Sequence, residues 1–116
     1  MRILVLEDDS SRITAFIERF HIHELTITEN ARAAIDYLTA NEYDYIFLDN
    51  DLGYNNGSGI DVAQFLNENL ENTNNKATII IHSWNTPASK CILSMLHNAR
   101  RVPYNSTNFF AITIDK

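Results

Sequence analysis

Short apolar runs that alternate with segments of helical periodicity restrict the fold of this sequence more than any other feature. Residues 3–6 (Ile-Leu-Val-Leu) and 78–81 (Thr-Ile-Ile-Ile) show no polar alternation, which is typical of strands covered by helices on both faces. Further strands are expected at 24–28, where polar and apolar residues alternate as on an edge strand, at 43–48 and at 100–104. Between the strands, apolar side chains recur at helical spacing at 13–20, 31–38, 62–70 and 88–99. This order predicts a single α/β layer sandwich with a five-stranded parallel sheet.

The segment 105–116 departs from this alternation. Residues 109–114 (Phe-Phe-Ala-Ile-Thr-Ile) are aromatic and β-branched, a composition that disfavours a helix. We therefore expect a short strand or an extended arm where such a fold usually ends in a helix. The chain would then consist of a domain at 1–104 and a C-terminal extension at 105–116 packed on the same domain.

Charge and hydropathy restrict the possible partners. Fifteen acidic and nine basic residues give a formal net charge of −6, and such a surface repels the phosphate backbone of nucleic acids. No apolar run approaches the length of a membrane span. Cys91 is the single cysteine, which rules out an internal disulfide, and its spacing places it on the apolar face of the fourth helix. We expect a soluble cytoplasmic protein that binds neither nucleic-acid backbones nor membranes.

Acidic residues follow two of the predicted strands directly. Glu7, Asp8 and Asp9 come after the first strand, and Asp49 and Asp51 come after the third. In open parallel sheets, ligands bind beyond the carboxyl ends of the strands, where the strand order reverses. Two carboxylates ~5 Å apart repel each other by ~3 kcal/mol at an effective dielectric constant of about 20, so such a cluster needs a cation or a shared proton. Oxygen ligands suit Mg²⁺; Asp9 alone is explained as well by a place in the first turn of a helix.

Three residues at the end of the fourth strand remain open to two interpretations each. The Ser83 hydroxyl could bond a phosphoryl oxygen, or it could be a turn residue. His82 could be a general acid or base beside a phosphate site, or a structural histidine. Trp84 could stack on a base or simply cover the pocket.

At this point the sequence resembles the receiver domains of response regulators. The residues that carry the resemblance are Arg2-Ile-Leu-Val-Leu-Glu-Asp-Asp9, Tyr45-Ile-Phe-Leu-Asp49, Gly59-Ile-Asp-Val62, Thr78-Ile-Ile-Ile-His-Ser83 and Val102-Pro103-Tyr104. The resemblance implies a flavodoxin-like three-layer sandwich with strand order 2-1-3-4-5. It also places Asp49 at the phospho-acceptor position, Glu7 and Asp8 at the metal-binding acid pair, and Ser83 at the hydroxyl that senses the phosphoryl group.

The departures from that family point to a sub-family. Receivers carry a lysine before the proline of strand five, whereas this sequence has Val102. Strand alternation aims the neighbouring Arg101 at the opposite face unless a bulge intervenes. The acidic Asp-Leu-Gly loop at 51–53, the Ile-His-Ser strand end at 81–83 and Arg-Val-Pro at 101–103 resemble the cyclic-phosphate-processing receiver-like domains. In that sub-family the Asp-Leu-Gly is commonly preceded by histidine, and here the residue is Asn50.

Three functions follow from these patterns. The first is a Mg²⁺-dependent phosphoesterase that hydrolyses or binds a cyclic phosphate of a nucleotide-derived metabolite. Asp49, His82, Ser83 and Arg101 would be its catalytic residues, and Glu7, Asp8, Asp49 and Asp51 its metal ligands. The second is a stand-alone receiver phosphorylated on Asp49. The third is a pseudo-receiver without chemistry, whose aromatic segment 109–114 contacts a partner or a second subunit in a homodimer.

Overall fold

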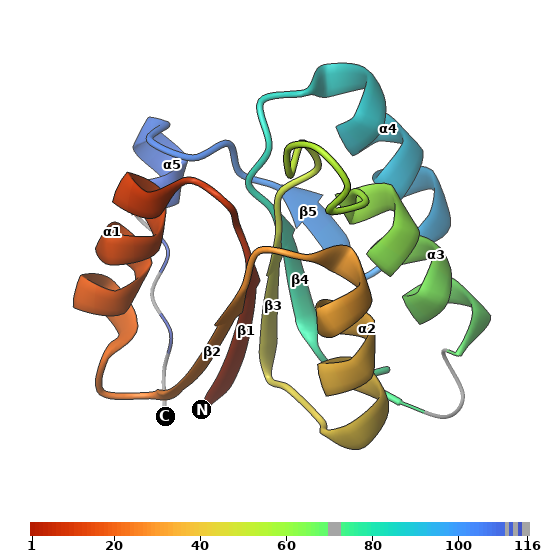
Figure 1. The fold of residues 1–116 in the computed structure, drawn as a ribbon, viewed down its shortest axis with the longest axis horizontal. Coiled ribbons are helices and arrows are strands. Elements are labelled where there is room, and N and C mark those ends of the chain that lie inside the picture. The colour runs from red at the N-terminus through yellow and green to blue at the C-terminus, as the bar shows by residue number, and fades with distance from the viewer. Residues whose placement is uncertain (70–72, 111, 113, 115–116) are drawn as a thin grey trace.

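Ten elements alternate along the chain in the computed structural model, which describes residues 1–69, 73–110, 112 and 114 (Figure 1). The strands are β1 (Arg2–Leu6), β2 (Glu24–Thr28), β3 (Tyr45–Leu48), β4 (Thr78–Ile81) and β5 (Ala99–Arg101). The helices are α1 (Ser10–Phe20), α2 (Ala31–Ala40), α3 (Gly59–Glu68), α4 (Thr86–Met95) and α5 (Thr107–Phe110). Leu70, Ala111 and Thr113, for which we predicted a helix or an arm, lie outside the described residues. No helix in the described ranges combines the length and the apolar character that crossing a membrane would require.

The sheet is parallel, and its strand order is β2-β1-β3-β4-β5. The predicted α/β sandwich and its order 2-1-3-4-5 are therefore confirmed, and β2 is the exposed edge strand that its alternation indicated. The order reverses at β1, which pairs with β2 on one side and with β3 on the other. Leu6 and Leu48 are partners in that register, so the residues that follow them emerge side by side.

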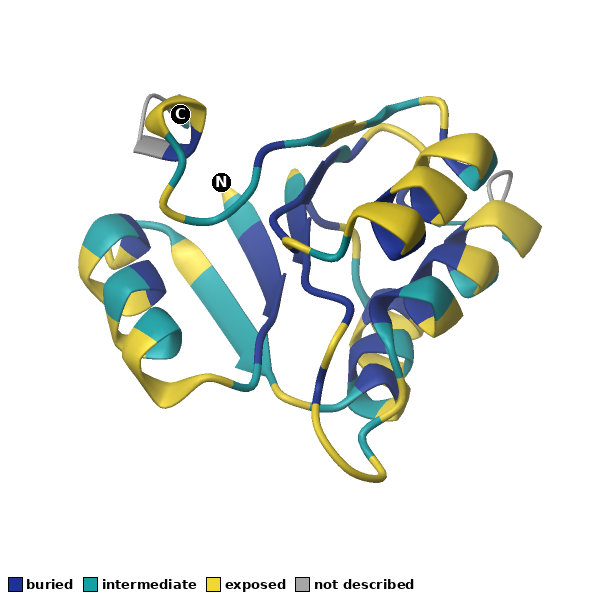
Figure 2. Ribbon diagram, turned by 90° about the horizontal axis from the view of Figure 1, so that it is seen from above, coloured by how far each residue is buried: buried dark blue, intermediate teal, exposed yellow. Residues whose placement is uncertain are grey.

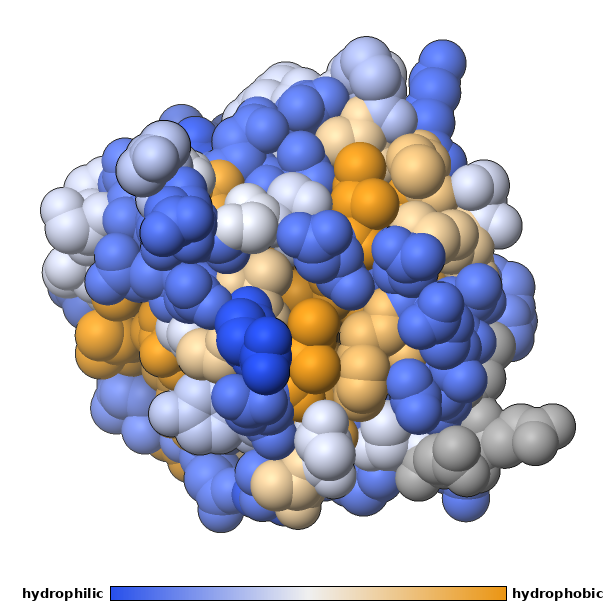
Figure 3. Space-filling view, turned by 45° about the vertical axis from the view of Figure 1, so that its right-hand side comes forward, coloured by the Kyte–Doolittle hydropathy of each residue, from blue (hydrophilic) through white to orange (hydrophobic). Residues whose placement is uncertain are grey.

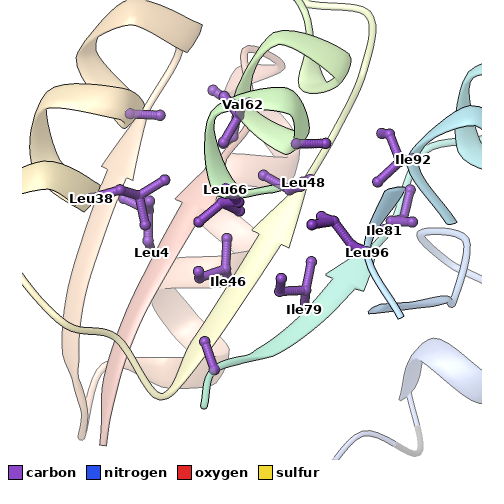
Figure 4. Close-up of a cluster of buried hydrophobic side chains, with 14 of the residues drawn as sticks. Leu4, Leu38, Ile46, Leu48, Val62, Leu66, Ile79, Ile81, Ile92 and Leu96 are labelled. Atoms are coloured by element: carbon purple, nitrogen blue, oxygen red, sulfur yellow. The ribbon is translucent and has the colours of Figure 1, made fainter. Parts of the chain in front are cut away.

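Two apolar layers cover the two faces of the sheet. Figure 2 shows the sheet with helices on both sides and its central strands buried. Because side chains alternate along a strand, Leu4 and Leu6 enter the layer beneath α2, α3 and α4, whereas Ile3 and Val5 enter the layer beneath α1. Figure 4 shows the first layer, in which β3 and β4 pack against α3 and α4. The outer surface on the α2–α4 side is mostly hydrophilic, with apolar groups exposed in a narrow band (Figure 3).

The C-terminal segment contains a single helical turn, α5, instead of the short strand or arm that we predicted. Local composition was misleading here because tertiary packing decides the outcome: Phe109 and Ile112 are buried in the α1-side layer, and the Phe109 ring meets Phe16 edge-on at 5.8 Å between centroids. The Ser106 hydroxyl accepts a hydrogen bond from the Phe109 amide and caps the turn. The predicted strand at 100–104 is also shorter than expected, although Tyr104 N–H still bonds the His82 carbonyl.

Cys91 is exposed, so its predicted place on the apolar face of α4 is wrong. The helix buries Ala88, Ser89 and Ile92. The apolar residues of this short segment fit two overlapping helical faces. The core covers the face with Ala88 and Ile92, and Cys91 lies outside it.

Candidate functional site

The carboxylates that follow β1 and β3 meet at the point where the strand order reverses. The Asp49 amide donates to the Leu6 carbonyl at 3.1 Å, which continues the β1–β3 pairing and places Asp49 beside Glu7. Glu7, Asp49 and His82 each bring one potential ligand atom to within 4.8 Å of the others. The topology thus gathers residues that are far apart in the sequence, from the ends of three neighbouring strands.

Glu7 is fully buried, and both of its oxygens are engaged. Oε2 accepts from the amides of Asp8 at 3.0 Å and Asp9 at 3.1 Å, and Oε1 accepts from Nε2 of His82 at 2.9 Å. Burial favours the neutral acid, but the hydrogen bonds from His82 and from the Asp9 amide, together with the Arg12 charge, hold the pKa of Glu7 below its usual value. Glu7 is therefore an ionised carboxylate at neutral pH.

His82 lies beneath Glu7 and does not line the surface. Its ring is wholly buried, with the Phe16 ring 5.2 Å away and edge-on, and this burial lowers the pKa of His82, so the ring is neutral. The neutral ring donates through Nε2 to Glu7, which leaves Nδ1 as the lone-pair nitrogen, and Nδ1 has no hydrogen-bond partner among the described residues. The predicted role of His82 as direct proton donor to a leaving group does not fit this position. His82 instead positions Glu7 from behind.

Asp49 is 6% exposed, and the pKa of its carboxyl is shifted furthest among the acids of this cluster. Burial, followed by the charge of Glu7, raises the pKa of Asp49 to about 7, although the Asn50 amide donates to its Oδ1 at 2.8 Å. Burial and the same Glu7 charge also raise the pKa of Asp8. The repulsion expected from the sequence is thus present, and the site favours binding a proton or a cation.

A cavity of about 250 Å³ opens over these carboxylates. It is lined by Glu7, Asp8, Asp9, Arg12, Asp49, Asp51, Ser83, Trp84 and Asn85. All four predicted metal ligands line it, as does Ser83. His82 and Arg101, which we also predicted as catalytic, do not.

Arg12 supplies the positive charge of this cavity, and sequence reasoning missed it. Its side chain is 30% exposed, its Nη1 lies 3.8 Å from Oε1 of Glu7, and its guanidinium lies 4.8 Å from the centre of the Tyr104 ring. Asp9 caps α1 by accepting from the backbone amides of Ser11 and Arg12. The signal that could have revealed Arg12 is this cap, because it places Arg12 in the first helical turn above Glu7.

Arg101 lies apart from the acidic cavity. Its Nε donates to the Ser83 carbonyl at 3.4 Å, and its side chain lines a separate hollow with Arg100, Val102, Asn108 and Ile112. Arg101 pairs with Ile81 in the register, so it belongs to the opposite face of the sheet, as strand alternation indicated. Its structural contact is with the backbone of the segment that carries Ser83.

The loop after β3 is tied to the start of α4. Asn50 accepts from the Ile60 amide at 3.2 Å and donates to Asp51 at 3.1 Å, and Asn85 also donates to Asp51, at 3.2 Å. The backbone N–H of Asn85 donates to the Ser83 hydroxyl oxygen at 3.0 Å, which leaves the hydroxyl proton available to a ligand. Asn50, at the position where the sub-family carries histidine, thus braces this loop.

Gly59 permits the closest approach in the site. A Cβ at this position would overlap the carbonyl oxygen of Asp49, so only glycine lets α3 begin directly against the strand end. The α3 start therefore helps to fix the backbone from which the Asp49 carboxyl projects.

A parallel sheet of order 2-1-3-4-5, with acidic residues gathered where β1 and β3 end, defines a receiver-type domain. Solved receiver domains agree with this fold. The chain is similar to a CheY-like response regulator receiver domain from Methanospirillum hungatei, with 14% identity, a TM-score of 0.73 and coverage of 95% of this chain and 86% of that one. It is also similar to the receiver domain of a sensor histidine kinase from Pseudomonas aeruginosa, solved with magnesium in its active-site cleft, with 16% identity, a TM-score of 0.72 and coverage of 95% and 89%.

The sequence comparison is more specific than the fold. The profile of the cyclic-phosphate processing receiver domain matches residues 2–98, so the chain belongs to that family. No curated protein matches the sequence significantly.

Proposed function

We propose that this protein is a Mg²⁺-dependent phosphoesterase that binds and hydrolyses a cyclic phosphate of a nucleotide-derived metabolite. The observation that carries the proposal is the cavity in which buried carboxylates from β1 and β3 face the guanidinium of Arg12. A cation at the carboxylates and an arginine beside them are the two groups that recognise a phosphate ester.

The acidic cluster suits a hard divalent cation. A pKa of about 7 for Asp49 means that the cluster without metal holds a proton near neutral pH, and a cation would relieve the same repulsion. Asp8 and Asp49 would hold Mg²⁺ directly, Asp51 stands at the rim, and Glu7 lies behind with its oxygens already engaged. The related Pseudomonas aeruginosa receiver domain holds magnesium in the corresponding cleft. When bound, Mg²⁺ would polarise the phosphate oxygens as a Lewis acid.

Arg12 and Ser83 would bind the phosphate oxygens. Val102 occupies the place of the receiver lysine and is a buried apolar side chain, so strand β5 supplies no charge there. Arg12 reaches the cavity from α1 instead, and a guanidinium can donate two parallel hydrogen bonds to a phosphate. The Ser83 hydroxyl adds a neutral donor.

Asp49 would start the reaction. Its carboxylate either attacks phosphorus in line or accepts a proton from an attacking water molecule. If the carboxylate attacks, an Asp49–phosphate bond forms, the ring P–O ester bond breaks, the leaving oxygen takes a proton from water, and a second water molecule then hydrolyses the Asp49–phosphate bond. If water attacks, its oxygen bonds to phosphorus, the ring P–O ester bond breaks, and the proton accepted by Asp49 passes to the leaving oxygen. The net reaction adds one water molecule to the cyclic diester and yields a monoester.

The direct test is to incubate the purified chain with a 2′,3′-cyclic nucleotide and Mg²⁺ and to follow the monoester. We expect turnover that disappears with a chelator and in Asp49→Asn. Turnover that survives both changes would contradict the mechanism.

A second test separates the two candidate arginines. Arg12→Ala should lower turnover about 10- to 100-fold, since a hydrogen bond to a charged group contributes about 1.5–3 kcal/mol. Arg101→Ala should have a smaller effect, and Arg100→Ala, at an exposed position on the same strand, is the matched control. A larger loss from Arg101→Ala than from Arg12→Ala would restore Arg101 as the phosphate ligand.

The receiver fold also favours a second function, phosphorylation of Asp49 as in a stand-alone response regulator. This function predicts a mass increase of one phosphoryl group on Asp49 after treatment with acetyl phosphate, which hydroxylamine removes because the product is an acyl phosphate, and no hydrolysis of any cyclic phosphate. The pseudo-receiver alternative relied on the segment 109–114 as an interface, but Phe109 and Ile112 are buried in the protein's own core.

A further inference from the structure

Trp84 lines the wall of the acidic cavity and is an exposed residue. It lines the cavity together with Ser83, the residue directly before it. The residue is 57% exposed, whereas tryptophan is highly buried on average in folded proteins. An aromatic surface of this size is costly to expose to water, so its position beside a polar cavity calls for an explanation.

The indole is held in place although it is exposed. Nε1–H donates to the Tyr104 carbonyl at 2.8 Å. This hydrogen bond satisfies the single polar atom of the side chain and ties it to the segment after β5. A ring whose polar atom is already bonded offers a ligand its π-face and no hydrogen bond, which suits stacking.

The neighbours of Trp84 connect this ring to the phosphate-binding groups. Tyr104 contacts both Trp84 and Arg12. Its carbonyl accepts the hydrogen bond from the indole, and the Arg12 guanidinium lies over its ring. The Ser83 hydroxyl and the Trp84 ring follow one another along the same backbone. A ligand with its phosphate between Arg12 and Ser83 would therefore carry its next group toward Trp84.

We propose that Trp84 forms a base-stacking subsite, so that the ligand of this cavity is a nucleotide whose nucleobase stacks on the indole while its cyclic phosphate lies at the carboxylates. This inference rests on the proposed function for the place of the phosphate, and it adds which part of a nucleotide-derived ligand is recognised. Stacking on an aromatic side chain tolerates any base, because every base has a π-face. Trp84 thus selects ligands that carry a base over ligands that do not, without selecting among bases, and it takes no part in bond breaking.

Trp84 is the single tryptophan of the chain, so its fluorescence reports on the subsite directly. Three probes are titrated in Mg²⁺ and read immediately after mixing: 2′,3′-cyclic AMP, glycerol 1,2-cyclic phosphate, which has the same ring diester and no base, and adenosine, which has no phosphate. We expect 2′,3′-cyclic AMP (below, cyclic AMP) to quench the tryptophan fluorescence and glycerol 1,2-cyclic phosphate to bind without quenching it. Calorimetry should show at least about fivefold tighter binding of cyclic AMP than of the base-free diester.

Variants then assign the effect to the ring. Trp84→Ala should weaken cyclic AMP binding about 5- to 100-fold more than it weakens binding of the base-free diester, and Trp84→Phe should recover most of the difference. Tyr37→Ala removes another exposed aromatic ring, on α2 and outside the cavity, and should change neither affinity.

The outcomes separate this inference from the proposed function. Equal losses for both ligands in Trp84→Ala, or saturation by cyclic AMP without quenching, would overturn the stacking subsite even if hydrolysis occurs. Quenching and a Trp84-dependent preference without any turnover would support the subsite and refute the esterase. If neither cyclic phosphate binds, both proposals are wrong.

Discussion

Replacing Asp49 with asparagine should stabilise the protein at alkaline pH when no divalent cation is present. Burial and the charge of Glu7 raise the pKa of Asp49 from 3.8 to about 7. The folded state therefore binds more protons than the unfolded state between these two values, and stability falls as the pH rises through that window. About three pKa units at 1.36 kcal/mol each set an upper limit of about 4 kcal/mol. Asparagine is neutral throughout, so Asp49→Asn removes this cost.

The assay is thermal or urea unfolding in chelator at about pH 4 and about pH 8. We expect Asp49→Asn to gain about 2–4 kcal/mol relative to the wild type at the higher pH, or roughly 4 °C in Tm for each kcal/mol, and little at the lower pH, where both side chains are neutral. Asp36→Asn, an exposed carboxylate on α2, is the control and should stay within about 0.5 kcal/mol at both values. A gain that does not grow with pH, or a loss at pH 8, would refute the electrostatic account of the cluster.

The same experiment with Mg²⁺ tests the cation. The proposed function has Mg²⁺ bind the folded state at its carboxylates, so it should stabilise the wild type, and more at about pH 8 than at about pH 4, where a proton competes for Asp49. Asp49→Asn should lose most of this stabilisation. Equal stabilisation of both proteins would place the cation elsewhere.

Two further substitutions test how the site is supported. His82→Ala should lower the free energy of unfolding by about 3 kcal/mol, because it leaves the buried Glu7 carboxylate without one of its hydrogen-bond donors. His82→Gln keeps a donor and should recover part of the loss. Equal free energies of unfolding for the two variants would show that this hydrogen bond is unimportant. Gly59→Ala should lower the free energy of unfolding by about 1–3 kcal/mol and weaken Mg²⁺ binding, because the new Cβ must displace the Asp49 carbonyl. Unchanged Mg²⁺ affinity in calorimetry would show that the position of Asp49 does not depend on the start of α3.

The sheet and the gathering of the carboxylates could be predicted because both follow from local patterns and topology. Buried strands and helical periodicity define the α/β alternation, and parallel strands bring the residues after β1 and β3 to one edge. The segment 105–116 could not be predicted in the same way. Its aromatic and β-branched composition disfavours a helix, yet burial of Phe109 against Phe16 stabilises a helical turn, and such a long-range contact leaves no local signal.

The roles of the side chains at the site depend on which face of the sheet each one continues. One residue near the end of each of β1, β3 and β4 points into the layer beneath α1: Val5, Phe47 and Ile80. Side chains alternate along a strand, so the residues two positions further on continue the same face: Glu7, Asp49 and His82.

Arg101 pairs with Ile81, which points into the other layer, so its guanidinium starts from the wrong side of the sheet to reach the carboxylates. Val102, at the position of the receiver lysine, is buried in the α1-side layer and supplies no charge. The cap at Asp9 places Arg12 on the first turn of α1 above Glu7, so Arg12 starts on the same side of the sheet as the carboxylates. Strand alternation combined with the helix cap thus favours Arg12 over Arg101.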